Sequence, residues 1–106
     1  MKLDKSEALG QLAVSSTPFI TLFRHGTLQV ELYRPHKTDL QQAHTRDEAY
    51  VIIGGKGEFI NGEGRCTFGP GNFLFVPART GHRFENFSDD FSTWVLFYGP
   101  EGGEST

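Results

Sequence analysis

Apolar and polar residues alternate with a period of two along much of the chain after residue 18. In the stretch 28–33, Leu28, Val30 and Leu32 alternate with Gln29 and Glu31. A period of two indicates a β-strand with one buried face, because successive side chains of a strand point to opposite sides. Comparable short stretches, each bounded by turn residues, predict about eight strands, at residues 19–23, 28–33, 49–53, 58–60, 65–68, 73–76, 82–87 and 93–98. The pattern predicts an all-β domain, either a sandwich or a small barrel.

The first 18 residues form a leader before the predicted strands begin. Asp4, with Glu7 three residues later, resembles a capping box and predicts a short helix over about residues 5–12. Such a short helix is not stable alone, so it must dock on the rest of the domain; otherwise the leader is extended. We expect a single domain over residues 1–106, with a core at about 19–98 and a frayed tail at 99–106.

Composition narrows the class of protein. The 106 residues include 13 acidic and 10 basic side chains, a net charge of −3, which argues against a protein that follows nucleic-acid phosphates with clustered Lys and Arg. The single cysteine, Cys66, excludes an intrachain disulfide and a multi-thiolate zinc site, and we expect it to be a packing residue. Because the sequence has neither an apolar run long enough for a membrane span nor an apolar signal region, we expect a soluble, cytoplasmic protein.

Two groups of residues that can bind metal ions lie far apart in the sequence. The first is the stretch 42–48, with His44 and Glu48, and the second is centred on His82. Alternation places Glu48 and Tyr50 on one face of a strand, and His82 and Phe84 on one face of a later strand. If both faces point into one barrel, two imidazoles and a carboxylate converge, a ligand set that suits divalent first-row metals. The alternative is that the two histidines are hydrogen-bonded pocket residues in a barrel without a metal.

The spacing of these residues resembles the two sequence motifs of the cupin family. The first motif runs G-x5-H-x-H-x3,4-E-x6-G, and the residues in register with it are Gln42, His44, Glu48 and Gly55. The second motif runs G-x5-P-x-G-x2-H-x3-N, and the residues in register with it are Gly71, Pro77, His82 and Asn86. The resemblance covers about residues 28–98 and implies a jelly-roll barrel, also described as a double-stranded β-helix.

The resemblance also implies a set of metal ligands. In cupins the histidines and the glutamate of the motifs bind a divalent metal, which implies His44, Glu48 and His82 as ligands here. Gln42 stands where the first motif has its leading histidine, and it is a candidate fourth ligand through its amide oxygen. If Gln42 does not bind, His36 is the alternative. Such a set, with two histidines and one carboxylate, favours Fe²⁺, while Mn²⁺, Ni²⁺, Zn²⁺ and Cu²⁺ remain open.

Other residues are candidates for the walls of the pocket. Tyr50 is a candidate catalytic acid or base if its hydroxyl reaches the site. Three arginines flank the ligands and either bind a substrate carboxylate or are solvated surface residues; they are Arg46, Arg79 and Arg83. Two aromatic residues are expected to face inward, where they either contact substrate or fill the core; they are Phe84 and Trp94.

The resemblance implies several classes of function. The first hypothesis is a metal-dependent enzyme of the oxygenase type acting on a small organic molecule, although dioxygenases, isomerases, lyases and decarboxylases share the fold. The alternative is a non-catalytic cupin that binds a sugar, an acid or another metabolite, and a structural dimerisation domain comes third. We expect a small-molecule partner, no nucleic acid, no membrane, and a homodimer formed through the edge strand at 19–23.

Overall fold

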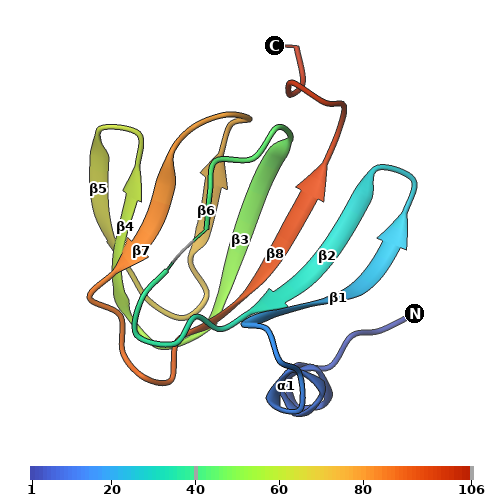
Figure 1. Cartoon of the computed structure of the whole chain (residues 1–106), viewed down its shortest axis with the longest axis vertical. Helices are drawn as coiled ribbons and strands as arrows, with labels where there is room; N and C mark the ends of the chain where they lie inside the picture. The colour runs from blue at the N-terminus through green and yellow to red at the C-terminus, as the bar shows by residue number, and fades with distance from the viewer. Residues whose placement is uncertain (40, 106) are drawn as a thin grey trace.

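The predicted strands form two antiparallel sheets in the computed structural model (Figure 1). The structure describes residues 1–39 and 41–105. In these residues the elements are α1 (Lys5–Ala13), β1 (Phe19–His25), β2 (Leu28–Tyr33), β3 (Asp47–Gly54), β4 (Gly57–Asn61), β5 (Gly64–Phe68), β6 (Phe73–Val76), β7 (His82–Glu85) and β8 (Ser92–Tyr98). The all-β fold class and the short N-terminal helix expected from the sequence are confirmed.

The order of the strands is that of a jelly roll. The larger sheet has the order β1-β2-β8-β3-β6, and the smaller sheet has the order β5-β4-β7. Pairs such as β2 with β8 are far apart in the sequence, so the chain crosses repeatedly between distant strands. In Figure 1 the connection between β2 and β3 runs from the bottom of the view, where β2 ends, to the top, where β3 begins. We call residues 34–39 and 41–46 the strap, because they belong to the connection between the two ends of the sandwich.

Two apolar clusters stabilise the fold. The inner cluster includes Tyr50 and Phe84, which are at most 2% exposed; its other buried members are Tyr33, Ile52, Phe59, Phe68, Val76, Phe91 and Val95. The outer cluster joins α1 to the larger sheet, with Leu12 and Leu32 buried and Trp94 packed against them. Neighbouring residues Leu32 and Tyr33 belong to different clusters because side chains of a strand alternate between its faces.

The helix begins where the capping pattern predicts. A side-chain oxygen of Asp4 accepts a hydrogen bond from the backbone nitrogen of Glu7 at 3.1 Å, which satisfies one of the free donors of the first turn. The buried residues of α1 are Ala8 and Leu12, so one face of the helix docks on the sheet as its short length requires. Within the described ranges, no helix is long and apolar enough to cross a membrane.

Residues 99–104 return to the start of β3. The backbone nitrogen of Gly102 donates to the carbonyl oxygen of Thr45 at 2.6 Å, and that of Glu104 donates to Oδ2 of Asp47 at 2.8 Å. Oδ1 of Asp47 accepts from the backbone nitrogen of Ala78 at 2.9 Å. The bonds from Glu104 and Ala78 hold the pKa of Asp47 below its ordinary value. Residues 99–104, which the sequence predicts as a frayed tail, thus make hydrogen bonds to the segment around Asp47.

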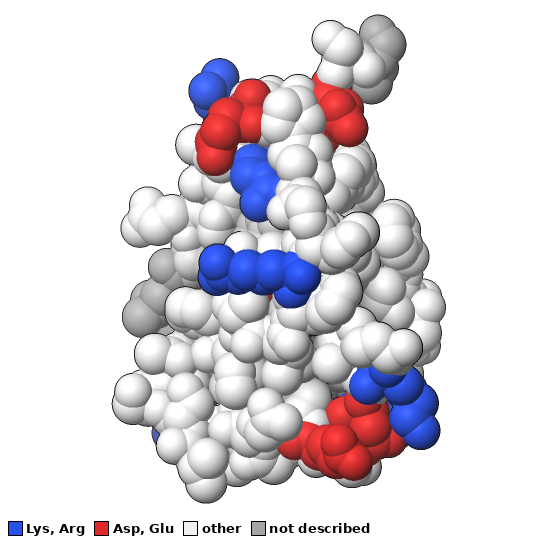
Figure 2. All heavy atoms as spheres, turned by 90° about the vertical axis from the view of Figure 1, so that its right-hand side faces the viewer, with Lys and Arg blue, Asp and Glu red and all other residues white. Residues whose placement is uncertain are grey.

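The surface carries charges of both signs. Figure 2 shows one face of the molecule, on which Lys and Arg gather in small groups, some beside Asp and Glu, with uncharged surface between them. Two aromatic side chains of β6 are exposed, Phe73 by 65% and Phe75 by 41%. Cys66 on β5 is also exposed, so the expectation that it is a packing residue is wrong.

Candidate metal centre

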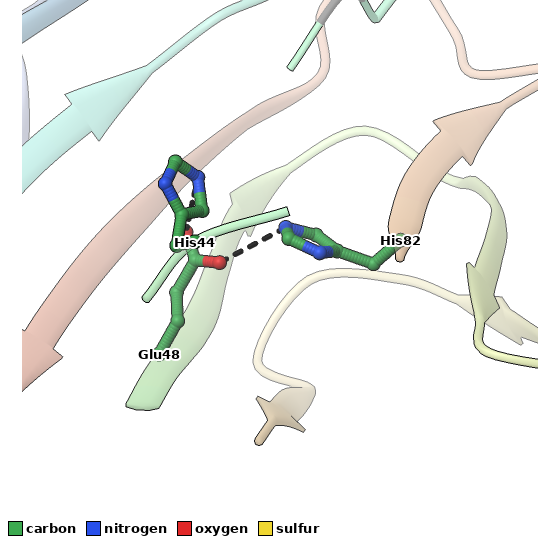
Figure 3. A group of neighbouring side chains, drawn as sticks. All are labelled: His44, Glu48 and His82. Carbon is green, nitrogen blue, oxygen red and sulfur yellow. Dashed lines mark ion pairs between the residues drawn. The ribbon is translucent and has the colours of Figure 1, made fainter. Parts of the chain in front are cut away.

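Three side chains from separate parts of the sequence meet in the interior. Glu48 is the second residue of β3, His82 is the first residue of β7, and His44 lies in the strap just before β3. One ligand atom from each lies within 4.8 Å of the others. Figure 3 shows the two imidazoles on either side of the Glu48 carboxylate. The structure thus brings together the three residues that the cupin motifs imply as ligands.

The distances within this cluster are short and its burial is uneven. Nε2 of His82 lies 2.9 Å from Oε1 of Glu48, and Nε2 of His44 lies 3.9 Å from Oε2 of the same carboxylate. The side chains of His82 and Glu48 are at most 1% exposed, whereas that of His44 is 34% exposed. The cluster is therefore closed on the side of the two strands and open to solvent at His44.

The hydrogen bonds around His82 fix its tautomer. Nδ1 lies 2.9 Å from the carbonyl oxygen of Thr80, which can only accept, so Nδ1 carries a proton. In the neutral ring this leaves the lone pair on Nε2, and in the protonated ring Nε2 donates to Glu48 at 2.9 Å. A backbone carbonyl commonly holds a metal-binding histidine in this way. The lone pair of Nε2 points toward the Glu48 carboxylate, where a cation would be bound.

Among the described residues, the carboxylate oxygens of Glu48 and Nε2 of His82 face one another and have no hydrogen-bond partner outside the cluster. All three atoms are buried. Burying an ionised carboxylate without donors is costly, and proteins compensate such a charge with a pair or a metal. Three electron-pair donors that face one another fit a divalent cation.

Burial and the Glu48 carboxylate together shift the pKa values of the ionisable groups beside it. Burial lowers the pKa of His82, but the Glu48 carboxylate and the Thr80 carbonyl raise it by more, so the net pKa lies above its ordinary value. Burial and the charge of Glu48 raise the pKa of Tyr50 well above its ordinary value. Tyr50 therefore keeps its proton at neutral pH, which favours it as a hydrogen-bond donor rather than as a phenolate base.

A chain of hydrogen bonds leads from Tyr50 into the strap. The hydroxyl of Tyr50 donates to Oε1 of Gln41 at 3.0 Å, and Nε2 of Gln41 donates to Oδ2 of Asp39 at 2.9 Å. Oδ1 of Asp39 accepts from the hydroxyl of Tyr33 at 2.6 Å. Burial and this bond to Asp39 raise the pKa of Tyr33. The chain holds the Tyr50 ring against the cluster, with its centroid 6.1 Å from that of His82.

Asp39 also joins the two sheets. In addition to Tyr33 on β2, it accepts a hydrogen bond of 2.8 Å from the backbone nitrogen of Phe84 on β7. Only 8% of Asp39 is exposed. Sequence reasoning missed both Asp39 and Gln41, because a polar loop has no period from which an inward direction can be inferred. One signal did point to this segment, because His36, the alternative to Gln42 as a ligand, lies in the same loop as Asp39 and Gln41. His36 itself is exposed and lines a different hollow.

The predicted fourth ligand, Gln42, lines a pocket that His82 also lines. Gln42 is exposed and lines, with Gln41, His82 and Arg83, a pocket of about 490 Å³. The guanidinium of Arg83 pairs with Glu85. Whether the amide of Gln42 binds a metal stays a prediction.

The other residues predicted to form the walls of the pocket lie in several different places. Phe84 lies in the inner cluster, with its ring centroid 4.9 Å from that of Tyr50. Arg46 is turned away from the cluster, because its guanidinium donates to the carbonyl oxygens of Gly99, at 3.1 Å, and Thr27. Arg79 is exposed. Trp94 packs in the outer cluster against α1, so the prediction that it faces the pocket is wrong.

Comparisons with known proteins agree with this fold. A family model described as a cupin domain matches residues 29–98. An uncharacterized protein of Streptomyces coelicolor is 29% identical over 102 residues, which cover 94% of this chain and 95% of that protein.

Solved structures are similar over most of the chain. A protein from Neisseria meningitidis has a TM-score of 0.72 at 18% identity, covering 93% of this chain and 100% of the other. The DMSP lyase DddQ from Ruegeria pomeroyi has a TM-score of 0.65 at 24% identity, covering 76% of this chain and 46% of the lyase. This chain therefore matches less than half of the lyase. At these identities the likeness shows a shared fold.

Proposed function

The chain belongs to the cupin family, and we propose that it holds a divalent transition metal through His44, Glu48 and His82 and acts on a small organic molecule. The observation that carries this proposal is the buried Glu48 carboxylate with two imidazoles beside it, Nε2 of His82 at 2.9 Å from Oε1 and Nε2 of His44 at 3.9 Å from Oε2. A cation at this point would compensate the carboxylate and use the free lone pair of His82.

The three proposed ligands favour some metals over others. Two imidazoles and one carboxylate suit Fe²⁺ and leave room for other ligands, and Mn²⁺, Ni²⁺, Zn²⁺ and Cu²⁺ accept the same donors. When bound, such an ion supplies Lewis acidity or, if it is iron, the capacity for oxygen chemistry. The His44 side chain is 34% exposed and His82 lines a pocket, and both leave space for a small molecule to approach.

The residues around the cluster have separable roles in this proposal. Tyr50 keeps its proton and donates a hydrogen bond to Oε1 of Gln41, so it positions Gln41 as a hydrogen-bond donor and does not act as a base. The side chains at the mouth, among them Gln41, Gln42 and Arg83, are polar, and the pocket of about 490 Å³ suits a small polar substrate. Arg83 can contact a substrate only by exchanging its partner Glu85.

Two reaction types have separate support. An oxygenase-type reaction is favoured by a donor set that suits ferrous iron. A lyase reaction is favoured by the similarity to a DMSP lyase, a likeness that covers less than half of that chain. A protein that only binds a small molecule is the alternative to both, and it is favoured by the exposed Gln42 in place of the leading histidine of the motif.

Metal analysis tests the shared premise of the enzyme proposals. Protein reconstituted with Fe²⁺ without oxygen, and separately with Mn²⁺, is freed of unbound metal and measured by elemental analysis. We expect about one metal ion per chain in the wild type and a large loss in His44→Ala and His82→Ala, because each removes one donor. His25→Ala is the matched control, since His25 is exposed at the end of β1.

The outcomes separate the proposals. A wild type without stoichiometric metal would leave only the non-catalytic binding protein. Metal retained in full by both cluster variants would mean that the ligands are other residues. Loss of metal in His25→Ala to the same extent would mean that the assay reports general unfolding and not the cluster.

A further inference from the structure

A second hollow lies away from the metal cluster, between α1, the ends of β1 and β2, and the segment after β7. Its volume is about 1090 Å³. His82 begins β7, whereas Phe87, which lines this hollow, follows the end of β7. None of the three cluster residues lines it. We call it the helix groove.

Part of the helix groove has apolar walls, and the other lining residues are polar, among them Ser15, Ser16, Thr17 and Thr38. Leu9 and Leu12 come from α1, Phe19 from the start of β1, and Phe87 from the turn between β7 and β8. Leu9 and Leu12 belong to the outer cluster and Phe87 packs on the inner cluster, so the groove lies where the two clusters come together. Phe19 is 45% exposed. An open hollow of this size with aliphatic and aromatic walls has the character of a ligand site.

The rim of the groove is basic, although the whole chain has a net charge of −3. Arg34, His36 and Lys37 all line the groove, and all three are exposed. Asp89 is the acidic residue among its lining, and the guanidinium of Arg34 donates to the backbone carbonyl oxygen of Asp89 at 3.1 Å, leaving other donors of the guanidinium available. Two permanent positive charges, on Arg34 and Lys37, thus lie beside one negative charge, on Asp89.

We propose that the helix groove is a second binding site, for an amphipathic organic anion that consists of an alkyl chain and a carboxylate. The alkyl chain lies between α1 and Phe87 and gains hydrophobic free energy from buried surface. The carboxylate lies at the rim, where Lys37 and Arg34 attract it. A cationic amphiphile of the same length meets the same walls but is repelled by this rim.

The groove and the pocket beside the metal cluster are separate hollows that share Gln41, and none of His44, Glu48 and His82 lines the groove. Tyr33 and Gln41 line the groove, and both belong to the hydrogen-bond chain to Tyr50. The wall between the two hollows therefore contains residues that are hydrogen-bonded within this chain. Binding in the groove therefore requires neither a metal nor movement of His44, Glu48 or His82.

Titration of the full metal-free chain with laurate tests the proposal. Binding is measured by calorimetry below the micellar concentration and mapped by backbone amide chemical shifts. We expect saturable binding with shift changes at residues 9–19, 34–37 and 87–89. Dodecyltrimethylammonium, with the same chain length and the opposite charge, is expected to bind about 10-fold more weakly.

Two variants locate the site. Ser16→Trp places a bulky side chain at an exposed position of the groove and is expected to weaken laurate binding by about 10-fold or more. Lys37→Asn removes one charge and is expected to weaken it about 3-fold. Lys37 has a φ of 67°, a region that asparagine tolerates, so this variant keeps the backbone. Lys56→Asn, at another exposed lysine, is the matched control and is expected to bind as the wild type does.

Several results would overturn the proposal. They are the absence of saturable laurate binding, equal binding of the cationic amphiphile, and affinity unchanged in both Ser16→Trp and Lys37→Asn. Shift changes centred on residues 44–50 and 82, with binding lost in His82→Ala, would place the anion in the metal pocket instead. Unchanged laurate binding in His82→Ala is the expected result, and it holds whether or not the metal proposal is correct.

Discussion

Glu48 enters the interior at the second position of β3, where 1% of its side chain is exposed. Burying an ionised carboxylate costs several kcal/mol unless charges or hydrogen bonds compensate it. Its neighbours are two imidazoles, of which one has its Nδ1 hydrogen held by the Thr80 carbonyl oxygen. In the metal-free protein a proton on His82 supplies the compensating charge, and a divalent cation would supply it in the metal-bound protein.

Because a metal ion would replace the proton on His82, we expect the stability of the metal-free fold and the affinity for metal to depend on pH. The pKa of His82 is raised in the folded protein. The protonated His82–Glu48 pair therefore stabilises the metal-free fold below the ordinary histidine pKa of about 6.5, and that contribution is lost as the pH rises through the folded pKa. Metal binding requires the neutral imidazole, so the affinity for metal rises with pH.

Thermal unfolding with and without Mn²⁺ measures this linkage. We expect the increase in melting temperature caused by Mn²⁺ to grow between about pH 6 and pH 8. In His82→Ala that increase should be small at every pH. A metal-induced increase that is largest at the acidic end would contradict the assignment of His82 as a ligand.

Gln42 permits a test at a single residue. Replacing it by histidine restores the motif and adds an imidazole at the mouth of the pocket that Gln42 lines with His82. We expect Gln42→His to bind Mn²⁺ about 10-fold more tightly or better, given that even outer partners of metal ligands change affinity by about that factor. The comparison is Gln11→His, which adds a histidine at an exposed position of α1. An affinity for Gln42→His no higher than for Gln11→His would show that position 42 does not reach the metal.

At the scale of elements, the strap determines how the sheets are held around the site. Asp39 accepts hydrogen bonds from Tyr33 on β2 and from the backbone of Phe84 on β7, which is an edge strand of the smaller sheet. Both Tyr33 and Phe84 are buried. Without Asp39 these donors would be left unsatisfied, and each unsatisfied buried donor costs about 1–3 kcal/mol.

Asp39→Ala tests the structural role of the strap. We expect the free energy of unfolding to fall by about 3 kcal/mol in chemical denaturation. Asp90→Ala removes an exposed carboxylate and should change it by less than about 0.5 kcal/mol. Equal small effects of the two substitutions would mean that Asp39 does not join the sheets.

Elements differ in how well the sequence predicted them. Alternation and turn residues predicted the positions of the strands. A glycine of the cupin motifs is required at its position for a physical reason. Gly55 has a φ of 84°, and a Cβ there would lie 2.4 Å from Cα of Phe91. His44, Glu48 and His82 were predictable because each stands at or just before a strand start, where motif spacing fixes the register.

The predictions were wrong where alternation does not show which face of a strand points into the inner cluster. β8 lies inside the larger sheet, with the inner cluster on one face and α1 on the other, so both faces are apolar and the period does not tell them apart. This is why Trp94 was assigned to the wrong face, while its neighbour Val95 lies in the inner cluster. Asp39 and Gln41 were missed because their positions depend on contacts made across the whole fold.

At the scale of the whole molecule, the larger sheet has two free edges, β1 and β6. The predicted homodimer uses β1, whose residues carry few charges. In Figure 2 the face at the right-hand side of Figure 1, where β1 lies, has uncharged surface between small charged groups. An edge strand of this kind can pair with a second copy unless charges prevent it.

Sedimentation tests the dimer and the edge that it uses. We expect a dimer at micromolar concentration and a monomer for Phe23→Lys, because a charge on an edge strand opposes pairing. Phe73→Lys places the same charge on the other edge, β6, and should remain dimeric. A wild-type monomer would remove the prediction, and a monomer only in Phe73→Lys would move the interface to β6.

The central claim is that His44, Glu48 and His82 together bind one metal ion. An anomalous difference map from crystals loaded with Mn²⁺ tests this most directly, because it locates the ion independently of any activity. The map should contain one strong peak per chain, in contact with Nε2 of His44, the carboxylate of Glu48 and Nε2 of His82. A loaded crystal with no peak at this cluster, or with its strongest peak elsewhere in the chain, would contradict the claim.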